Sequence, residues 1–186
     1  MLRSRTATER PLHWVGSAKK DLRAFSGEVV DDLGYALSVV QLGGTPPSAN
    51  ARKSEGPGVF ELVEEHATMR CAMRGKKTET ETVDAGSGDV LVDLGFPEAD
   101  ERKLRVQLAM RLNELIAARP LTQGRAAQLF GIPQPHVSEL KNYKLSRFSS
   151  ERLLHFVTLL DRDVEIIIRP KAKGHASGVV SVLVAT

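Results

Sequence analysis

Hydrophobic positions recur at helical intervals in two separate parts of the chain. In the first part they predict a pair of helices between residues 18 and 43, with the apolar stripe Leu22, Phe25, Val29, Leu33, Ala36, Leu37 and Val40. In the second part they predict one helix of about four turns, ending before Pro120, with the stripe Leu104, Leu108, Leu112, Leu115 and Ile116. The chain is therefore expected to be mainly α-helical.

Short segments of a different pattern flank the first helical pair. Residues 10–17, RPLHWVGS, predict a short strand, and residues 59–66, VFELVEEH, have the length and β-branched content of a second strand. Between them, residues 43–58 are dense in Gly, Pro and Ser, which is typical of a loop. A sheet of so few strands is marginally stable in water, so residues 1–66 are expected to form a small, partial α+β segment.

A polar stretch separates the two parts. Residues 67–88 contain almost no large apolar side chain after Met73, and such a segment buries too little surface to offset the entropy of ordering it. It is therefore expected to be a linker. The sequence predicts three regions: the partial segment 1–66, the linker 67–88 and a helical domain over residues 89–186.

Residues 121–142, LTQGRAAQLFGIPQPHVSELKN, contain two short helical patterns joined by a turn. Thr122 can cap the first helix through its side-chain oxygen. The apolar positions of that helix are Ala126, Ala127, Leu129 and Phe130. Gly131 supplies the left-handed backbone conformation that ends a helix, and Ile132 can fill the corner between the two helices. The pattern predicts two packed helices meeting at a tight turn.

The second of these helices turns a small polar face outward. Its inward positions are Val137 and Leu140, and a helix with two such anchors leaves the opposite side in solvent. Amide and hydroxyl groups on that side can donate to and accept from base edges in the major groove of DNA. The candidate base contacts are Gln134, Pro135, Ser138, Glu139 and Asn142.

The distribution of charge favours the same region. The net charge is only +3, but residues 101–149 carry nine Lys and Arg against three Glu, whereas residues 1–66 carry eight Lys and Arg against nine Asp and Glu. A local basic patch is the electrostatic signature of a nucleic-acid interface. The candidate phosphate contacts around the two short helices are Gln123, Arg125, Lys141, Lys144 and Arg147.

The stretch 121–142 resembles the helix-turn-helix of the Cro/repressor (XRE) superfamily, in which Gln123 would open the first helix and Gly131 would make the turn. The wider region, about residues 89–184, resembles HigA-type antitoxins. One departure is Pro133, because many relatives have a capping Ser or Thr at this position. The resemblance implies a sequence-specific DNA-binding regulator that binds a double-stranded DNA operator as the autorepressor of a type II toxin-antitoxin system.

The first region, residues 11–66, resembles the beginning of HigB or RelE-like toxins, which are ribosome-dependent mRNA endonucleases with a compact α+β fold. The resemblance stops near His66, before the strands that carry much of the catalytic apparatus in that family. Acid-base cleavage of RNA needs positioned proton donors and cations, so this truncated fragment is expected to hold no catalytic residue and the chain to be no enzyme. The basic side chains of residues 19–23 are interpreted as a solvated helix face.

Two other functions stay open from the sequence. The chain could be an interaction protein that neutralises an intact HigB/RelE-like toxin and binds DNA only weakly. It could also retain ribosome-dependent mRNA endonuclease activity, which would require an active first region.

Beyond the two short helices, Ser149 can cap a further helix that closes the bundle. Residues 163–170 and 178–185 are rich in β-branched residues and predict a C-terminal β-hairpin. Pairing with a second copy would cover its edge, and a twofold dimer would place two recognition helices about one DNA turn, roughly 34 Å, apart. The alternative is a strand folded back on its own domain. The candidate dimerisation residues are Val164, Ile166 and Ile168.

Cysteine and histidine usage predicts neither a disulfide nor a metal site. Cys71 is the single cysteine, and the five histidines show no paired helical spacing, so no metal and no cofactor are expected. No apolar run is long enough to cross a bilayer, and the basic start of the chain precedes no signal segment, so no membrane association is expected and a cytoplasmic location is predicted.

Overall fold

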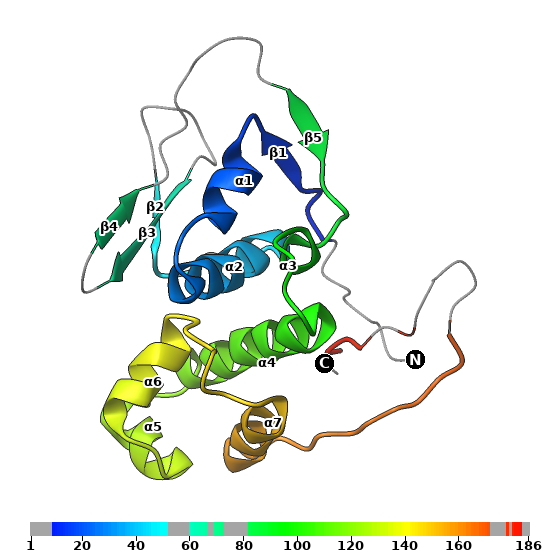
Figure 1. Cartoon of the computed structure of the whole chain (residues 1–186). Coiled ribbons are helices and arrows are strands. Elements are labelled where there is room, and N and C mark those ends of the chain that lie inside the picture. Colours follow the sequence, from blue (N-terminus) through cyan, green and yellow to red (C-terminus); the bar gives the residue numbers. More distant parts are fainter. Residues whose placement is uncertain are drawn as a thin grey trace.

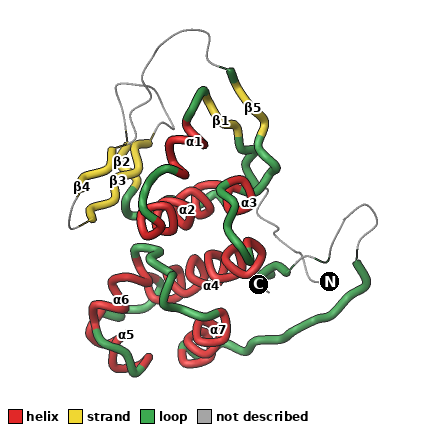
Figure 2. Tube along the Cα trace, viewed as in Figure 1, coloured by secondary structure: helices red, strands yellow, loops and turns green. Residues whose placement is uncertain are grey.

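The computed structural model describes residues 9–51, 60–66, 69–72, 82–171, 178 and 180–183. These residues form two stacked layers, with all of the described strands in one layer (Figures 1 and 2). The first layer contains α1 (Ala18–Arg23) and α2 (Gly27–Gln41). The short helix α3 (Val90–Asp93) adjoins α2 and leads into the second layer. The second layer contains α4 (Ala99–Ala117), α5 (Gln123–Phe130), α6 (Gln134–Lys141) and α7 (Ser150–Leu159).

The strands of the first layer form two small antiparallel sheets. One pairs β1 (His13–Val15) with β5 (Val83–Ala85), and places Trp14 opposite Asp84. The other has the order β2-β3-β4 and contains β2 (Ala49–Ala51), β3 (Phe60–His66) and β4 (Met69–Ala72). The strands predicted within residues 10–17 and 59–66 are confirmed by β1 and β3.

The region predicted to be a linker, residues 67–88, contains two of these strands. β4 pairs with its neighbour β3, and β5 pairs with β1, which is distant in the sequence. Three-residue strands such as β5 carry almost no local signal, because their stability comes from backbone pairing with a distant partner. The pairing of β5 attaches the residues that precede α3 to the start of the chain.

The apolar side chains of the described residues form two clusters, and the first of them contains residues from both layers. Twenty-two buried residues make up the first cluster, in which Tyr35, Val39 and Leu42 of the α2 region join the cores of α4 to α7. The second cluster joins the first layer to α3 and its flanking loop through Trp14, Leu22, Val29, Leu33, Val90, Leu91 and Leu94. Complete burial of such a side chain stabilises a fold by about 1.5–3 kcal/mol. α2 therefore buries two faces, where the sequence pattern predicts a single apolar stripe.

The middle of α2 approaches the α3–α4 loop at Gly34. A Cβ added at Gly34 would lie 2.7 Å from Cε2 of Phe96. Glycine in a helix interior costs about 1 kcal/mol relative to alanine, and here the close packing of Phe96 offsets that cost. The guanidinium of Arg102 lies over the aromatic ring of Phe96, with its Cζ 4.3 Å from the ring centroid.

A buried carboxylate attaches α3 to the first layer. Asp93, at the end of α3, accepts hydrogen bonds from Trp14 Nε1 at 2.8 Å and from the backbone N–H of Ser87 at 3.1 Å. Lys19 Nζ lies 3.3 Å from the same carboxylate. Burial raises the pKa of Asp93, but the hydrogen bonds from Trp14, Ser87 and Lys19 outweigh it and hold the pKa below its usual range.

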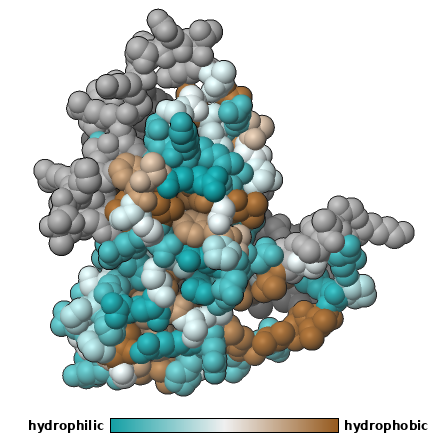
Figure 3. All heavy atoms as spheres, in the orientation of Figure 1, coloured by the Kyte–Doolittle hydropathy of each residue, from teal (hydrophilic) through white to brown (hydrophobic). Residues whose placement is uncertain are grey.

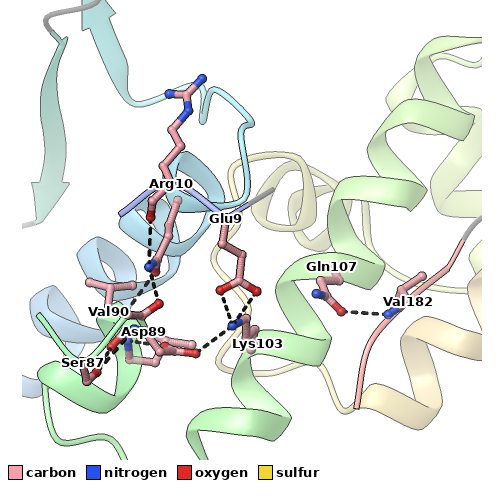
Figure 4. A network of polar contacts seen from close by, with 11 residues as sticks. Glu9, Arg10, Ser87, Asp89, Val90, Lys103, Gln107 and Val182 are labelled. Atoms are coloured by element: carbon pink, nitrogen blue, oxygen red, sulfur yellow. Dashed lines mark hydrogen bonds and ion pairs between the residues drawn. The ribbon is translucent and has the colours of Figure 1, made fainter. Parts of the chain in front are cut away.

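A second set of polar contacts joins the start of the described chain to α4 (Figure 4). Lys103 Nζ lies 2.8 Å from Glu9 Oε1 and 3.0 Å from Asp89 Oδ2. Burial lowers the pKa of Lys103, but the hydrogen bonds to these two carboxylates outweigh it and raise the pKa above its usual value. Farther along α4, Gln107 Oε1 accepts from the backbone N–H of Val182 at 2.9 Å. The C-terminal segment thus returns to α4.

The predicted C-terminal hairpin is not formed in the described part of the chain. Residues 162–171 leave α7 as an extended segment that belongs to no strand, and residues 180–183 belong to none either. β-branched composition alone does not make a strand, because a strand needs a neighbouring backbone for its hydrogen bonds. The remaining residues of this prediction, 172–177, 179 and 184–186, lie outside the described part.

No helix in the described ranges is both long and apolar enough to cross a bilayer.

Candidate nucleic-acid interface

The turn between α5 and α6 has the geometry that the sequence predicts. Thr122 caps α5, with its Oγ1 accepting from the backbone N–H of Arg125 at 3.3 Å. Gly131 ends that helix in the left-handed region at φ 63°, where a side chain would be strained. Ile132 is buried in the corner, and its N–H donates to the carbonyl of Ala127 at 3.0 Å. The angle between the two helices is thus fixed by local chemistry.

α6 is anchored to the bundle by two completely buried side chains, Val137 and Leu140. Pro133 stands at its N-cap without a side-chain hydrogen bond, as predicted. At the other end, Asn113 of α4 donates from Nδ2 to the carbonyl of Leu140 at 3.3 Å. This contact from α4 was not predicted from the sequence, because the helical stripe of α4 identifies only its apolar positions. The position of α6 against the bundle is therefore determined by the two buried side chains Val137 and Leu140 and by the side-chain amide of Asn113.

The predicted base contacts lie on the outer side of α6, and they differ in exposure and in the hydrogen bonds that they already form. Gln134, Pro135 and Asn142 are exposed, and Ser138 is half-buried between them. Asn142 Nδ2 donates to the carbonyl of Ser138 at 2.8 Å, so its amide nitrogen already satisfies the end of its own helix. Residues four apart on a helix lie above one another, which aligns positions 134, 138 and 142 in one row.

The fifth predicted base contact, Glu139, is bound to another candidate. Its Oε2 lies 2.6 Å from Nε of Arg147, a predicted phosphate contact. Arg147 Nη1 also lies 3.1 Å from Nε2 of His136. The structure thus joins a predicted base contact and a predicted phosphate contact into one ion pair beside α6.

The other predicted phosphate contacts differ in how far their side chains are exposed to solvent. Arg125 and Lys141 are exposed, and Gln123 is half-buried at the start of α5. Arg125 Nη1 donates to the side chain of Gln128 at 3.4 Å. Lys144 forms an ion pair with Asp32 of α2, with 3.0 Å between Nζ and Oδ2. The first layer therefore reaches one of the candidate DNA contacts, which the sequence pattern did not predict.

The first layer has a shallow hollow of about 530 Å³ lined by Gly16, Lys19, Lys20, Arg23, Ala24 and Asp84. One of its basic side chains, Lys19, forms an ion pair with Asp93. Among the described residues, no three His, Cys, Asp or Glu side chains come together as a metal site. The arrangement of donors and cations around α5 and α6 remains the best-defined candidate site.

The family that matches the chain covers α3 to α7. A family described as a helix-turn-helix domain matches residues 90–169. A solved structure described as an XRE family transcriptional regulator is 47% identical in sequence, over 48% of this chain and 100% of that one, with a TM-score of 0.45. No curated protein matches the chain. Residues 90–169 are a helix-turn-helix domain, and through the sequence identity with this solved protein the chain belongs to the XRE family.

Proposed function

We propose that the protein is a sequence-specific DNA-binding transcriptional regulator that reads the major groove with α6. The observation that supports this proposal most strongly is the orientation of α6. Val137 and Leu140 are completely buried, so the row of polar side chains at positions 134, 138 and 142 faces away from the bundle. The family match and the regulator named in the solved structure point in the same direction.

Contacts to bases and to phosphates are assigned to different residues in this proposal. Gln134 has an exposed amide that can donate to and accept from one base edge, which gives sequence preference. Arg125 and Lys141 are exposed cations on the two sides of the turn, and each can neutralise a phosphate of any sequence. Binding is therefore expected to weaken steeply with salt.

Replacing Gln134 by alanine is expected to relax base preference, whereas replacing Lys141 by alanine is expected to weaken binding to all duplexes alike. A good amide-base contact contributes about 1–3 kcal/mol of discrimination, while loss of one phosphate contact reduces the slope of log K against log salt by about 0.9. Enrichment of a random duplex library against each variant, followed by salt titration on an enriched duplex, measures both quantities. Equal losses on all sequences from both variants would contradict the assignment.

We further propose, on the resemblance to HigA-type antitoxins, that the regulator represses its own promoter within a toxin-antitoxin system and that an intact HigB/RelE-like toxin is a partner. The first layer is proposed to have no catalytic role, because the resemblance to toxins stops near His66. The first layer is proposed to act as a structural support for the DNA-binding domain, through its helices α1 and α2 and its strands β1 to β5.

A homodimer is also proposed, through the extended segment that follows α7. Figure 3 shows an apolar strip at the edge of the second layer, where residues 164–168 leave α7. Ile166 is 80% exposed and Ile168 is 93% exposed, which is unusual for isoleucine. The backbone of residues 162–171 is extended and in no sheet. An extended, apolar, unpaired segment is suited to pair with its copy in a second subunit.

Replacing Ile166 by lysine is expected to convert the dimer to a monomer, because strand pairing would bury the face shared by positions 164, 166 and 168. The matched control is Ile167→Lys. Ile167 is also exposed but faces the other side of an extended strand, so this change is expected to leave the dimer intact. Sedimentation of the wild-type chain and both variants measures the mass in solution. A monomeric wild-type chain, or equal effects of the two substitutions, would exclude this dimer.

A further inference from the structure

Two adjacent carboxylates of α2 hold the loop that follows the proposed recognition helix. Asp32 Oδ2 lies 3.0 Å from Lys144 Nζ, and the carboxylate is only 8% exposed while the lysine side chain is 36% exposed. Asp31 accepts from Ser146 Oγ at 3.4 Å and lies 3.1 Å from Nη1 of Arg102 on α4. In Figure 1 the loop between α6 and α7 lies directly against α2. The first layer therefore contacts the DNA-binding domain beside α6.

The loop holds Lys144 close to α6. The backbone N–H of Lys144 donates to the carbonyl of Glu139, within α6, at 2.9 Å. On either side of Lys144, Tyr143 and Leu145 are buried, and Tyr143 has a left-handed backbone with φ 59°. This conformation is restrictive for a residue other than glycine, so the loop has little freedom to move the lysine elsewhere. The ammonium group is fixed beside the end of α6, where the phosphates flanking a bound major groove would pass.

We propose that Asp32 competes with the DNA backbone for Lys144, so that α2 lowers the affinity of the helix-turn-helix domain for DNA. This inference rests on the proposed DNA-binding function. A phosphate that approaches Lys144 comes within a few ångströms of Asp32, and like charges at such a distance repel. The lysine must either leave the carboxylate or bring the phosphate close to it. Either change opposes binding, and the low exposure of Asp32 limits screening by salt.

The test replaces Asp32 by asparagine in the full chain and measures binding to a short random-sequence duplex at low ionic strength. The Kd is expected to fall about three- to tenfold, because one ion pair no longer opposes the phosphate contact. The slope of log K against log salt is expected to become steeper by about 0.9, which corresponds to one added phosphate contact. Asp21→Asn is the matched control. Asp21 is an exposed carboxylate on α1 that accepts from Ser17, so the same loss of charge there is expected to change the Kd less than twofold.

A double-mutant cycle with Lys144→Met isolates the pair. In the Lys144→Met chain, Asp32→Asn is expected to lower the Kd less than twofold, because the cation for which carboxylate and phosphate compete is absent and only the direct repulsion between Asp32 and phosphate is removed. Equal tightening with and without Lys144, or weaker binding by Asp32→Asn, would overturn the proposal. Circular dichroism checks that each variant is folded. If Asp32→Asn does not fold, Asp31→Asn replaces it. This variant removes the neighbouring negative charge and leaves the pair of Asp32 and Lys144 in place, so the expected tightening is smaller, about twofold.

The outcomes separate this inference from the proposed function. If the wild-type chain and all variants fail to bind any duplex at low ionic strength, the DNA-binding function itself is wrong. If the wild-type chain binds and the Asp32 variant binds no tighter, only the competition is wrong.

Discussion

Replacing Leu140 by alanine is expected to lower the free energy of unfolding by about 2–5 kcal/mol and to abolish sequence preference in DNA binding. Leu140 is completely buried in the first cluster and is one of the two anchors of α6. Its truncation leaves a cavity beneath the helix that must present base contacts in register. Urea denaturation measures the stability, and enrichment of a duplex library measures the sequence preference.

The matched control is Leu129→Ala on the neighbouring helix α5. The sequence pattern places Leu129 on the buried face of that helix, but the structure leaves it 38% exposed, whereas Ala126, Ala127 and Phe130 are buried. The same loss of methylene and methyl groups there is expected to cost less than about 1 kcal/mol. A loss from Leu129→Ala as large as that from Leu140→Ala would mean that α5 and α6 pack differently from the geometry described above.

Replacing Asp93 by asparagine is expected to lower the free energy of unfolding at neutral pH by about 1–3 kcal/mol, because an amide cannot satisfy all the donors around the carboxylate. These donors are Trp14, Lys19 and the backbone of Ser87, so the loss weakens the junction between α3 and the first layer. Asp84→Asn, the same change at an exposed carboxylate of β5, is expected to have little effect. Thermal unfolding of the two variants beside the wild-type chain measures the difference.

The same substitution has a defined pH dependence. The pKa of Asp93 is lower in the folded chain than the ordinary carboxyl value of 3.8, so the unfolded chain binds this proton more readily. The contribution of the charged carboxylate is therefore fully present above about pH 4 and is lost as the pH falls through the folded-state pKa. The difference in stability between wild type and Asp93→Asn is expected to shrink on acidification. A difference that stays constant from neutral pH to well below pH 4 would refute this ionisation.

Local signals sufficed to predict the region that carries the proposed function. Thr122 and Ser149 cap α5 and α7 as expected, and the left-handed Gly131 ends α5. Each of these features depends on residues a few positions apart, so one sequence contains the whole signal. The two anchors of α6 follow from the same short-range periodicity.

Long-range features were not predictable in the same way. The second buried face of α2 depends on α3 and α4, and β5 is stabilised by pairing with β1, so neither feature has a local pattern of its own. The C-terminal hairpin was predicted from β-branched composition and is wrong for the described residues, because no strand among them pairs with residues 162–171 or 180–183. Composition reports a preference for extended backbone, whereas a sheet requires a partner.

The candidate site was predicted as a list of exposed polar residues, and the structure adds how they are paired. No local pattern indicates that Glu139 binds Arg147 or that Lys144 binds Asp32. Side chains on separate elements meet only after the tertiary fold is known. Predicted contacts that form such pairs must exchange one partner for another when DNA binds.

The cluster that joins α3 to the first layer also determines where the protein can be divided. A fragment that starts at residue 89 would retain the whole match to the helix-turn-helix family. It would also bring Val90, Leu91 and Leu94, now buried against Trp14 and α2, into contact with water. Such a fragment would expose an apolar patch at its N-terminal end, and exposed apolar patches favour self-association. Poor solubility of the isolated domain would then reflect the position of the cut and not a defect in the DNA-binding unit.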